Sequence, residues 1–231
     1  MYKKIFKRFF DIVLSLLALT VLSPLFIFLM AAGAVAMHGN PFFVQPRPGI
    51  KDKYGKDKIF YLIKFRTMDN RKDENGKLLP DEIRLNGYGR FLRATSLDEF
   101  PEAINILKGD MSIVGPRPQL VRDMVFMTQE QRNRHNVRPG LTGLAQISGR
   151  NGISWEKKLE FDLRYIENIS LFEDFRIIFL TVWQAFVKQD GITQEGMDTA
   201  EDFGDWLLKC GEVSEEIYAQ RQDEAKELLL K

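Results

Sequence analysis

A long uncharged segment, residues 12–37, lies close to the N-terminus. Its 26 residues exceed the roughly 20 that a helix needs to cross the apolar layer of a bilayer, which favours a position in lipid. A cleaved signal peptide is the competing interpretation, but the apolar part of a signal peptide typically runs about 7–15 residues. We therefore expect this segment to remain in the mature protein as a membrane element.

Ser23 and Pro24 lie near the middle of this segment. Proline removes a backbone hydrogen bond and clashes with the preceding turn, so the helix should bend there. Basic residues flank the segment on both sides, at Lys3, Lys4, Lys7 and Arg8 before it and at Arg47, Lys51, Lys53, Lys56 and Lys58 after it. This favours a hairpin with both ends on the cytoplasmic face. A kinked helix that crosses the bilayer is equally open on these grounds.

The rest of the composition is that of a globular protein, with 45% hydrophobic and 28% charged residues. Lys and Arg number 33 against 32 Asp and Glu, so no charge excess indicates a nucleic-acid partner. One cysteine, Cys210, allows no internal disulfide, and together with His38 and His135 it makes no set of soft metal ligands. A metal here should be a hard cation, with magnesium the natural choice.

The pattern beyond the membrane segment predicts a mainly α fold with a small β component (α+β). We expect a strand or another buried element at 59–65, an exposed loop at 69–82 with a turn at Asn75-Gly76, and a helix at 98–108 that ends at Gly109. Residues 170–188 favour a core or membrane-apposed helix, and residues 198–231 an exposed, acidic, amphipathic helix. The Gly/Pro/Arg-rich motifs at 111–119 and 137–150 are interpreted as loops that pack against the helices.

Asp98 and Glu99 are the first candidates for chemistry. A structural explanation competes, because Ser96 and Glu99 have the spacing of a capping box and Pro101 is typical of a first helical turn. Acids are also common at helix N-termini for electrostatic reasons. The pair alone therefore leaves catalysis the less favoured interpretation.

Three Arg-Pro motifs strengthen the functional interpretation, at Pro46-Arg47-Pro48, Pro116-Arg117-Pro118 and Arg138-Pro139. Rigid loops that hold guanidinium groups suit a site that binds phosphates, and Arg93 and Arg150 add to the set. An ordinary solvated basic face is the alternative. The sequence lacks a phosphate-binding P-loop, a dinucleotide-binding glycine motif and a serine-hydrolase elbow. Phosphate chemistry with a carboxylate nucleophile and magnesium is the class that needs none of these.

These motifs resemble those of the monotopic phosphoglycosyl transferases, also called bacterial sugar transferases. The resemblance runs from Tyr2 to about Gly196 and includes KRFFD at 7–11, Ser23-Pro24, KFRTM at 64–68, and the runs 96–118 and 137–150. The short length is similar to that of the minimal members. Residues 149–170 are similar to the enzyme that begins bacterial N-linked protein glycosylation with UDP-N,N'-diacetylbacillosamine.

The resemblance implies roles for individual residues. Asp98 would be the nucleophile that attacks the sugar-linked phosphate, and Glu99 would hold Mg²⁺. Arg93 would contact the polyprenyl phosphate. The remaining expected substrate-binding residues are Arg117, Arg138, Arg150, Lys64 and Arg66. Ser23-Pro24 matches the break in the family's re-entrant helix, which shifts the preference to the hairpin.

The implied enzyme transfers a sugar 1-phosphate from a UDP-sugar to undecaprenyl phosphate, as the first membrane step of glycoconjugate assembly. The resemblance implies that the sugar is N-acetylated. It would face the cytoplasm from the bacterial inner membrane, with interfacial helices. Expected domains are the re-entrant helix at 1–40, the catalytic domain at 41–197 and a helical extension at 198–231. Further partners would be a second copy or downstream glycosyltransferases. The alternatives are a magnesium-dependent phosphohydrolase and a non-enzymatic scaffold.

Overall fold

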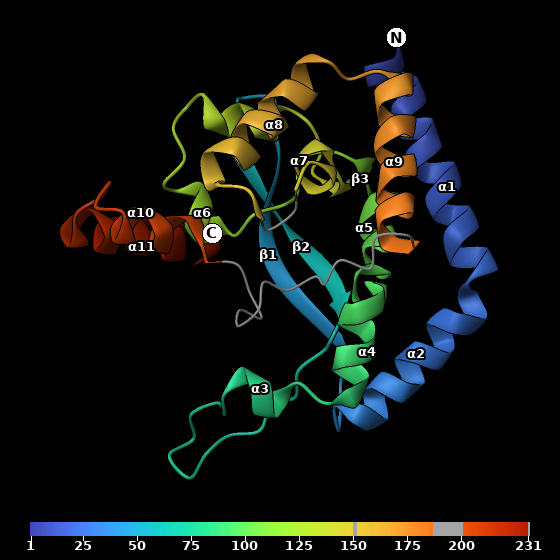
Figure 1. The fold of residues 1–231 in the computed structure, drawn as a ribbon, viewed down its shortest axis with the longest axis vertical. Helices are drawn as coiled ribbons and strands as arrows, with labels where there is room; N and C mark the ends of the chain where they lie inside the picture. Colours follow the sequence, from blue (N-terminus) through green and yellow to red (C-terminus); the bar gives the residue numbers. More distant parts are fainter. Residues whose placement is uncertain (150–151, 187–200, 231) are drawn as a thin grey trace. The chain divides into compact units, whose positions relative to one another are not determined.

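The computed structural model describes residues 1–149, 152–186 and 201–230 (Figure 1). Helices hold 58% of the described residues and strands 14%, which confirms the predicted α+β class. After a short π-helix at Tyr2–Phe6, the α-helices are α1 (Lys7–Val21), α2 (Ser23–Ala36), α3 (Asp81–Arg84), α4 (Gly87–Thr95), α5 (Glu102–Lys108), α6 (Val121–Met124), α7 (Leu144–Ile147), α8 (Trp155–Glu167), α9 (Leu171–Phe186), α10 (Phe203–Lys209) and α11 (Glu215–Leu230). The strands are β1 (Phe42–Lys51), β2 (Asp57–Phe65), β3 (Ser112–Val114) and β4 (Gly140–Thr142), and the 3₁₀ turns are η2 (Leu97–Glu99) and η3 (Gln131–Asn136).

The chain divides into two compact units that interleave along the sequence. Unit 1 holds Met1–Arg8, Pro46–Tyr61 and Gly109–Lys231, and unit 2 holds Phe9–Gln45 and Leu62–Lys108. β1 and β2 pair with each other and contribute residues to both units. Each unit has a hydrophobic core of its own.

A sharp bend separates α1 from α2 in unit 2 (Figure 1). The angle between the two helices is 67°. Pro24 lies in the first turn of α2, where its missing N–H breaks no helical hydrogen bond, and the Ser23 hydroxyl donates to the Thr20 carbonyl at 2.8 Å. No single described helix is long and apolar enough to cross a bilayer, whereas this bent pair is, by length and composition.

An aromatic core fixes α2 to the rest of unit 2. Leu29 of α2, Phe65 at the end of β2 and Leu92 of α4 are its fully buried members. Around them pack Leu25, Phe26, Met30, Phe42, Tyr88, Leu97 and Phe100. The Phe26 ring lies 5.2 Å from the Phe65 ring, tilted by 46°, and 5.3 Å from the Phe100 ring in the T-shaped arrangement that aromatic pairs favour. The core therefore joins α2 directly to the chain around residues 97–100.

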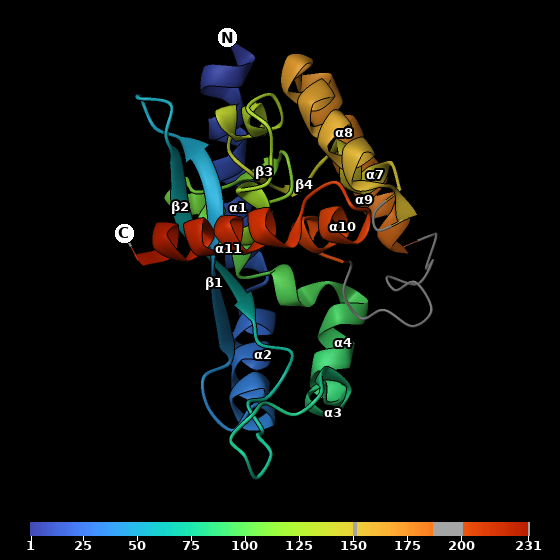
Figure 2. The same cartoon turned by 90° about the vertical axis from the view of Figure 1, so that its left-hand side faces the viewer.

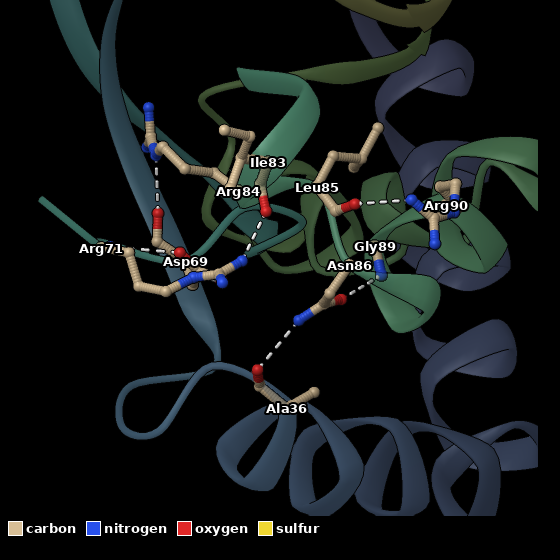
Figure 3. A network of polar contacts seen from close by, with 9 residues as sticks. All are labelled: Ala36, Asp69, Arg71, Ile83, Arg84, Leu85, Asn86, Gly89 and Arg90. Atoms are coloured by element: carbon tan, nitrogen blue, oxygen red, sulfur yellow. Dashed lines mark hydrogen bonds and ion pairs between the residues drawn. The ribbon is translucent and has the colours of Figure 1, made fainter. Parts of the chain in front are cut away.

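Asn86 ties the end of α2 to the start of α4 (Figure 3). Its amide nitrogen donates to the Ala36 carbonyl at 2.9 Å, and its amide oxygen accepts from the Gly89 backbone at 2.9 Å. One side chain thus satisfies an orphan group at each helix end. The Tyr88 hydroxyl adds a hydrogen bond of 2.8 Å to the Leu29 carbonyl.

Unit 1 is built on the parallel pair β3–β4, in which Ser112 lies opposite Gly140 and Val114 opposite Thr142 (Figure 2). Its core contains Val114, Leu144, Tyr165 and Ile177, from β3, α7, α8 and α9. Asp174 of α9 is buried and accepts hydrogen bonds from the Tyr2 hydroxyl (2.5 Å), the Lys7 ammonium (2.6 Å) and the Tyr165 hydroxyl (2.7 Å). These bonds anchor the N-terminal residues to α8 and α9.

Several predicted elements are confirmed. The strand at 59–65 lies within β2, and the 69–82 loop turns at Gly76, whose φ is 76°. The helix at 98–108 consists of η2 and α5, with Gly109 at φ 93° after its end. α9 confirms the helix at 170–188 over the residues that the structure describes.

Two predictions need correction. The motifs at 111–119 and 137–150 are not only loops, since they contain β3, β4 and α7, and short parallel strands leave no periodic pattern to detect. The C-terminal region forms two helices, of which α11 is mostly exposed, as predicted. Phe203 of α10 and Ala225 of α11 are nevertheless buried in unit 1, with Trp155 and Met124 among their respective neighbours.

Asp162 and Arg134 give a test of unit 1. They form a buried ion pair of 2.6 Å, with side chains 3% and 1% exposed. We expect Asp162→Asn to lower the free energy of unfolding by about 3–5 kcal/mol, because it leaves a buried guanidinium without its counter-charge. Asp223→Asn is the matched control, since its pair with Lys226 is exposed and should contribute at most about 0.5 kcal/mol. Equal losses in denaturant titrations of the two variants would contradict the prediction.

Candidate active site

The candidate acids lie on a tight turn between two helices of unit 2. α4 ends at Thr95, and the next residue, Ser96, has a left-handed backbone at φ 55°. The chain then forms the single 3₁₀ turn η2, on which Asp98 and Glu99 are partly buried. Pro101 is buried and α5 begins at Glu102. The capping-box interpretation of Ser96 is wrong, because its side chain makes no cap hydrogen bond. The left-handed residue turns the chain sharply just before the acids.

Lys64 of β2 pairs with two carboxylates at this turn, those of Glu99 and Glu102. Its ammonium lies 2.7 Å from Glu99 Oε1 and 3.2 Å from Glu102 Oε1. Lys64 and Glu99 keep 17% and 20% of their side chains exposed, so an ion from solvent can reach them, whereas Glu102 keeps 4%. Asn105 of α5 accepts a hydrogen bond of 3.0 Å from the Ile63 backbone, which aligns the end of β2 with α5.

Sequence reasoning missed Glu102. The apolar residues of α5 indicate which face enters the core, and an acid next to that face is normally assigned to solvent. Only the position of Lys64, 38 residues earlier in the chain, explains why a carboxylate is tolerated there. The spacing of residues within α5 holds no signal for it.

A single hydrogen bond orients the guanidinium of Arg93, which lies on α4. Its Nε donates to the Thr67 hydroxyl at 3.2 Å. Among the described residues, its two terminal nitrogens have no hydrogen-bond partner. A guanidinium oriented in this way presents two parallel donors, the geometry that binds phosphate oxygens.

The turn that carries Asp98 and Glu99, called the acid turn below, suits a magnesium ion that is shared with a substrate. Over residues 1–149, 152–186 and 201–230, no three side chains of His, Cys, Asp or Glu converge to form a closed metal cage. Mg²⁺ is usually held by one or two carboxylates, with water and phosphate oxygens as its other ligands. Asp98 and Glu99, adjacent and partly exposed, are a donor set of that kind.

Two of the Arg-Pro motifs meet in unit 1. Because β3 pairs with β4, Gly115-Pro116-Arg117 lies beside Arg138-Pro139-Gly140, and the Gly140 backbone donates to the Pro116 carbonyl at 2.9 Å. Arg138 Nε donates to the Gly109 carbonyl at 2.7 Å. The third motif joins them, since Arg47 donates to the Pro118 carbonyl at 3.2 Å. The three motifs therefore form one cluster in the fold.

The buried pair of Arg134 and Asp162 supports this cluster. Arg134 also donates to the Arg117 carbonyl at 2.7 Å, while the Arg117 side chain is exposed. The internal ion pair thus holds the backbone at Arg117, while the Arg117 side chain faces solvent. Neither Arg134 nor Asp162 belongs to the predicted site, because an ion pair between residues 28 apart has no sequence signature.

The predicted site residues thus fall in two groups. Unit 2 contains Lys64, Arg66, Arg93, Asp98 and Glu99, with Ser23 and Pro24 at the bend, and unit 1 contains Arg117 and Arg138. Lys64 and Glu99 are in direct contact. Arg66 lines a separate hollow of unit 2. Arg150 lies outside the described residues.

Comparison with known proteins finds a match to the bacterial sugar transferase family over residues 2–188. The chain is 46% identical over 199 residues to the uncharacterized sugar transferase EpsL of Bacillus subtilis, which covers 86% of this chain and 96% of that protein. It is 38% identical to the UDP-glucose:undecaprenyl-phosphate glucose-1-phosphate transferase of Klebsiella pneumoniae, over 80% of this chain but 41% of that protein. Identity to the exopolysaccharide production protein ExoY of Sinorhizobium fredii is 36%, over 76% and 83% of the two chains.

The meeting point of the Arg-Pro motifs depends on glycine. A Cβ on Gly140 would overlap the backbone nitrogen of Gly115, which cannot move without breaking the β3–β4 pair. We expect Gly140→Ala to lower the free energy of unfolding by about 1–3 kcal/mol. Gly87→Ala is the control, since a Cβ there meets nothing within 4 Å and the change should stay within about 0.5 kcal/mol. Identical unfolding curves for the two variants would refute the prediction.

Proposed function

Since the chain belongs to the bacterial sugar transferase family and is a phosphoglycosyl transferase, we propose that it transfers a sugar 1-phosphate from a UDP-sugar to undecaprenyl phosphate. The products are undecaprenyl-diphosphate-sugar and UMP. The observation that carries the proposal is the Asp98–Glu99 turn with the Lys64 ammonium 2.7 Å from Glu99. The names of the Klebsiella pneumoniae and Escherichia coli relatives, both undecaprenyl-phosphate glucose-1-phosphate transferases, support the same reaction.

In the first proposed step, a carboxylate oxygen of Asp98 attacks the phosphorus that carries the sugar. A bond forms between this oxygen and the phosphorus, the bond to the bridging oxygen breaks, and UMP leaves with the electron pair. The sugar phosphate is then attached to Asp98. The partly buried turn favours this step, because a carboxylate with less hydration is a better nucleophile.

In the second step, a phosphate oxygen of undecaprenyl phosphate attacks the same phosphorus. The bond to Asp98 breaks and its carboxylate is restored, so the enzyme returns to its starting state. No external proton or electron is needed in either step. Because the intermediate is covalent, UMP can leave the site before the lipid acceptor reacts.

Charge is the main obstacle to this chemistry, because both substrates are anions and the nucleophile is a carboxylate. Lys64 offsets part of this charge at Glu99 and Glu102, and Arg93 is the proposed contact of the undecaprenyl phosphate. We propose that Arg117 and Arg138 bind the diphosphate of the donor, together with Arg150. We also propose that Glu99 holds Mg²⁺, which would neutralise phosphate oxygens when bound.

We propose that α1 and α2 form a re-entrant membrane hairpin with both ends cytoplasmic, in the bacterial inner membrane. The 67° bend at Leu22 supports this, as do apolar side chains exposed along both helices, such as Leu16, Ile27, Phe28 and Val35. Exposed apolar side chains of this number have no favourable environment in water. Asp11 and Ser15 of α1 are buried, so these two polar side chains are turned away from the exposed apolar face.

α9 is a second proposed membrane contact. Phe172, Phe179 and Trp183 are exposed and recur at helical spacing, so they share one face, while Ile177 on the opposite face is fully buried. Aromatic side chains of this kind suit the interfacial zone of a bilayer. A site at that zone can receive a water-soluble donor and a lipid-anchored acceptor.

The choice of sugar forms part of the proposal. The similarity of residues 149–170 favours an N-acetylated sugar, UDP-N,N'-diacetylbacillosamine above all. The name of the Klebsiella pneumoniae relative makes UDP-glucose the informative comparison. A ranking of initial rates with the three donors UDP-N,N'-diacetylbacillosamine, UDP-N-acetylglucosamine and UDP-glucose tests this choice separately from the reaction type.

The test of the reaction is UMP release by detergent-purified protein with magnesium. We expect release beyond one equivalent only when undecaprenyl phosphate is present, and a loss of at least about 10³-fold in turnover for Asp98→Asn, which cannot act as the nucleophile. Asp81→Asn is the control, because Asp81 is a half-exposed acid of the same unit that pairs with Arg84. Steady UMP release without the lipid would favour the phosphohydrolase, and full activity of Asp98→Asn would remove the proposed nucleophile.

The test of the hairpin is the distance across the bend. With Cys210 replaced by Ser, nitroxide labels at positions 12 and 35 lie on α1 and α2. A straight helix over 23 residues would separate their backbones by about 35 Å, and a bend shortens this. We expect Pro24→Ala to shift the distance distribution toward that longer value. An unchanged distribution would mean that the proline does not hold the bend.

A further inference from the structure

A hollow of about 420 Å³ lies at the end of α2 in unit 2. It is lined mainly by polar side chains, namely His38, Asn40, Arg66, Asp69, Asn70 and Arg71. Its volume falls within the roughly 300–1,000 Å³ of ordinary small-ligand sites. Lys64, Glu99 and Glu102 are not among its lining residues, so it is separate from the contacts of the acid turn.

The one carboxylate of the hollow is already neutralised (Figure 3). Arg71 Nε donates to Asp69 Oδ2 at 2.9 Å, its backbone donates to Asp69 Oδ1 at 3.1 Å, and its terminal nitrogen donates to the Ile83 carbonyl. Arg84 donates to the Asp69 carbonyl at 2.8 Å. The Arg71 guanidinium holds the pKa of Asp69 below its ordinary value, so this pair contributes no net charge near neutral pH.

Arg66 is the uncompensated charge of the hollow. Its backbone is fixed by a hydrogen bond of 2.7 Å to the Pro41 carbonyl, and its side chain is half-buried. Within the described part of the chain, its guanidinium has no carboxylate partner and donates no hydrogen bond. A partly desolvated guanidinium without a partner is unfavourable unless an anion occupies the site.

Further hydrogen-bond donors line the same hollow. Asn40 uses its amide oxygen to accept from the Phe42 backbone at 2.9 Å, which leaves its amide nitrogen as a donor. Asn70 and His38 also line the hollow and are exposed. A guanidinium with amide donors beside it favours a phosphate oxyanion, either a phosphate diester or a phosphate monoester.

The position of the hollow in the chain indicates which kind of molecule supplies this oxyanion. The hollow begins at Met37, directly after the last residue of α2. If α2 lies in the bilayer, as the proposed function requires, this point is where the chain leaves the apolar layer. We propose that the Arg66 hollow binds the phosphate headgroup of an anionic lipid at the membrane surface.

The experiment measures lipid affinity directly, by native mass spectrometry of the full chain released from detergent. The probes are phosphatidylglycerol, undecaprenyl phosphate, phosphatidylcholine and inorganic phosphate. We expect Arg66→Gln to weaken binding of at least one anionic lipid tenfold or more, and Arg66→Lys to retain most of the affinity because the charge remains. Arg90→Gln is the matched control, since Arg90 is an exposed arginine of unit 2 that does not line the hollow.

Loss with phosphatidylglycerol would identify a bulk phospholipid, and loss with undecaprenyl phosphate alone would identify the acceptor; both support the proposal. Equal affinities of wild type and Arg66→Gln for every lipid would overturn it, as would binding of inorganic phosphate alone or an equal loss in Arg90→Gln. UMP assays on the same preparations keep the two proposals apart. Arg66-dependent lipid binding without UMP formation would reject only the proposed reaction, and UMP formation without Arg66-dependent lipid binding would reject only this site.

Discussion

The aromatic core of unit 2 is the constraint on which the candidate site depends. Leu29 of α2, Phe65 at the end of β2 and Leu92 of α4 are fully buried together, and Phe26 of α2 contacts the Phe100 ring, one residue beyond Glu99. The helix proposed to lie in the membrane and the turn that carries the acids therefore share one packed interior. Because packed interiors resist even small displacements, the acids have a fixed position relative to α2.

Charge compensation is the second theme of the structure. Lys64 pairs with two carboxylates, and Asp174 accepts hydrogen bonds from one ammonium and two hydroxyls. Arg134 pairs with Asp162 and supports the loop that carries the exposed Arg117. Each buried charge in these groups has an opposite charge or a donor beside it, as burial requires. Arg66 departs from this pattern among the described residues, and this departure is why it indicates a ligand.

The sequence predicts local features well and pairings poorly. The bend at Pro24, the strand at 59–65 and the end of α5 at Gly109 follow from the properties of single residues or short patterns, and the structure contains all three. The β3–β4 pair joins three-residue strands 28 positions apart, too short for any periodicity. Ser96 and Glu99 have the spacing of a capping box, but Ser96 is left-handed and its side chain makes no cap hydrogen bond. Glu102 was missed because its partner lies on another element.

The proposed mechanism requires Asp98 to form a covalent bond to the sugar phosphate. The most direct measurement is the intact mass of the purified protein after incubation with magnesium and the UDP-sugar, without the lipid acceptor. We expect a mass increase equal to one sugar phosphate less one water, located on the peptide that contains Asp98 and removed when undecaprenyl phosphate is added. An active preparation whose mass never changes, or a modification on a different residue, would contradict it.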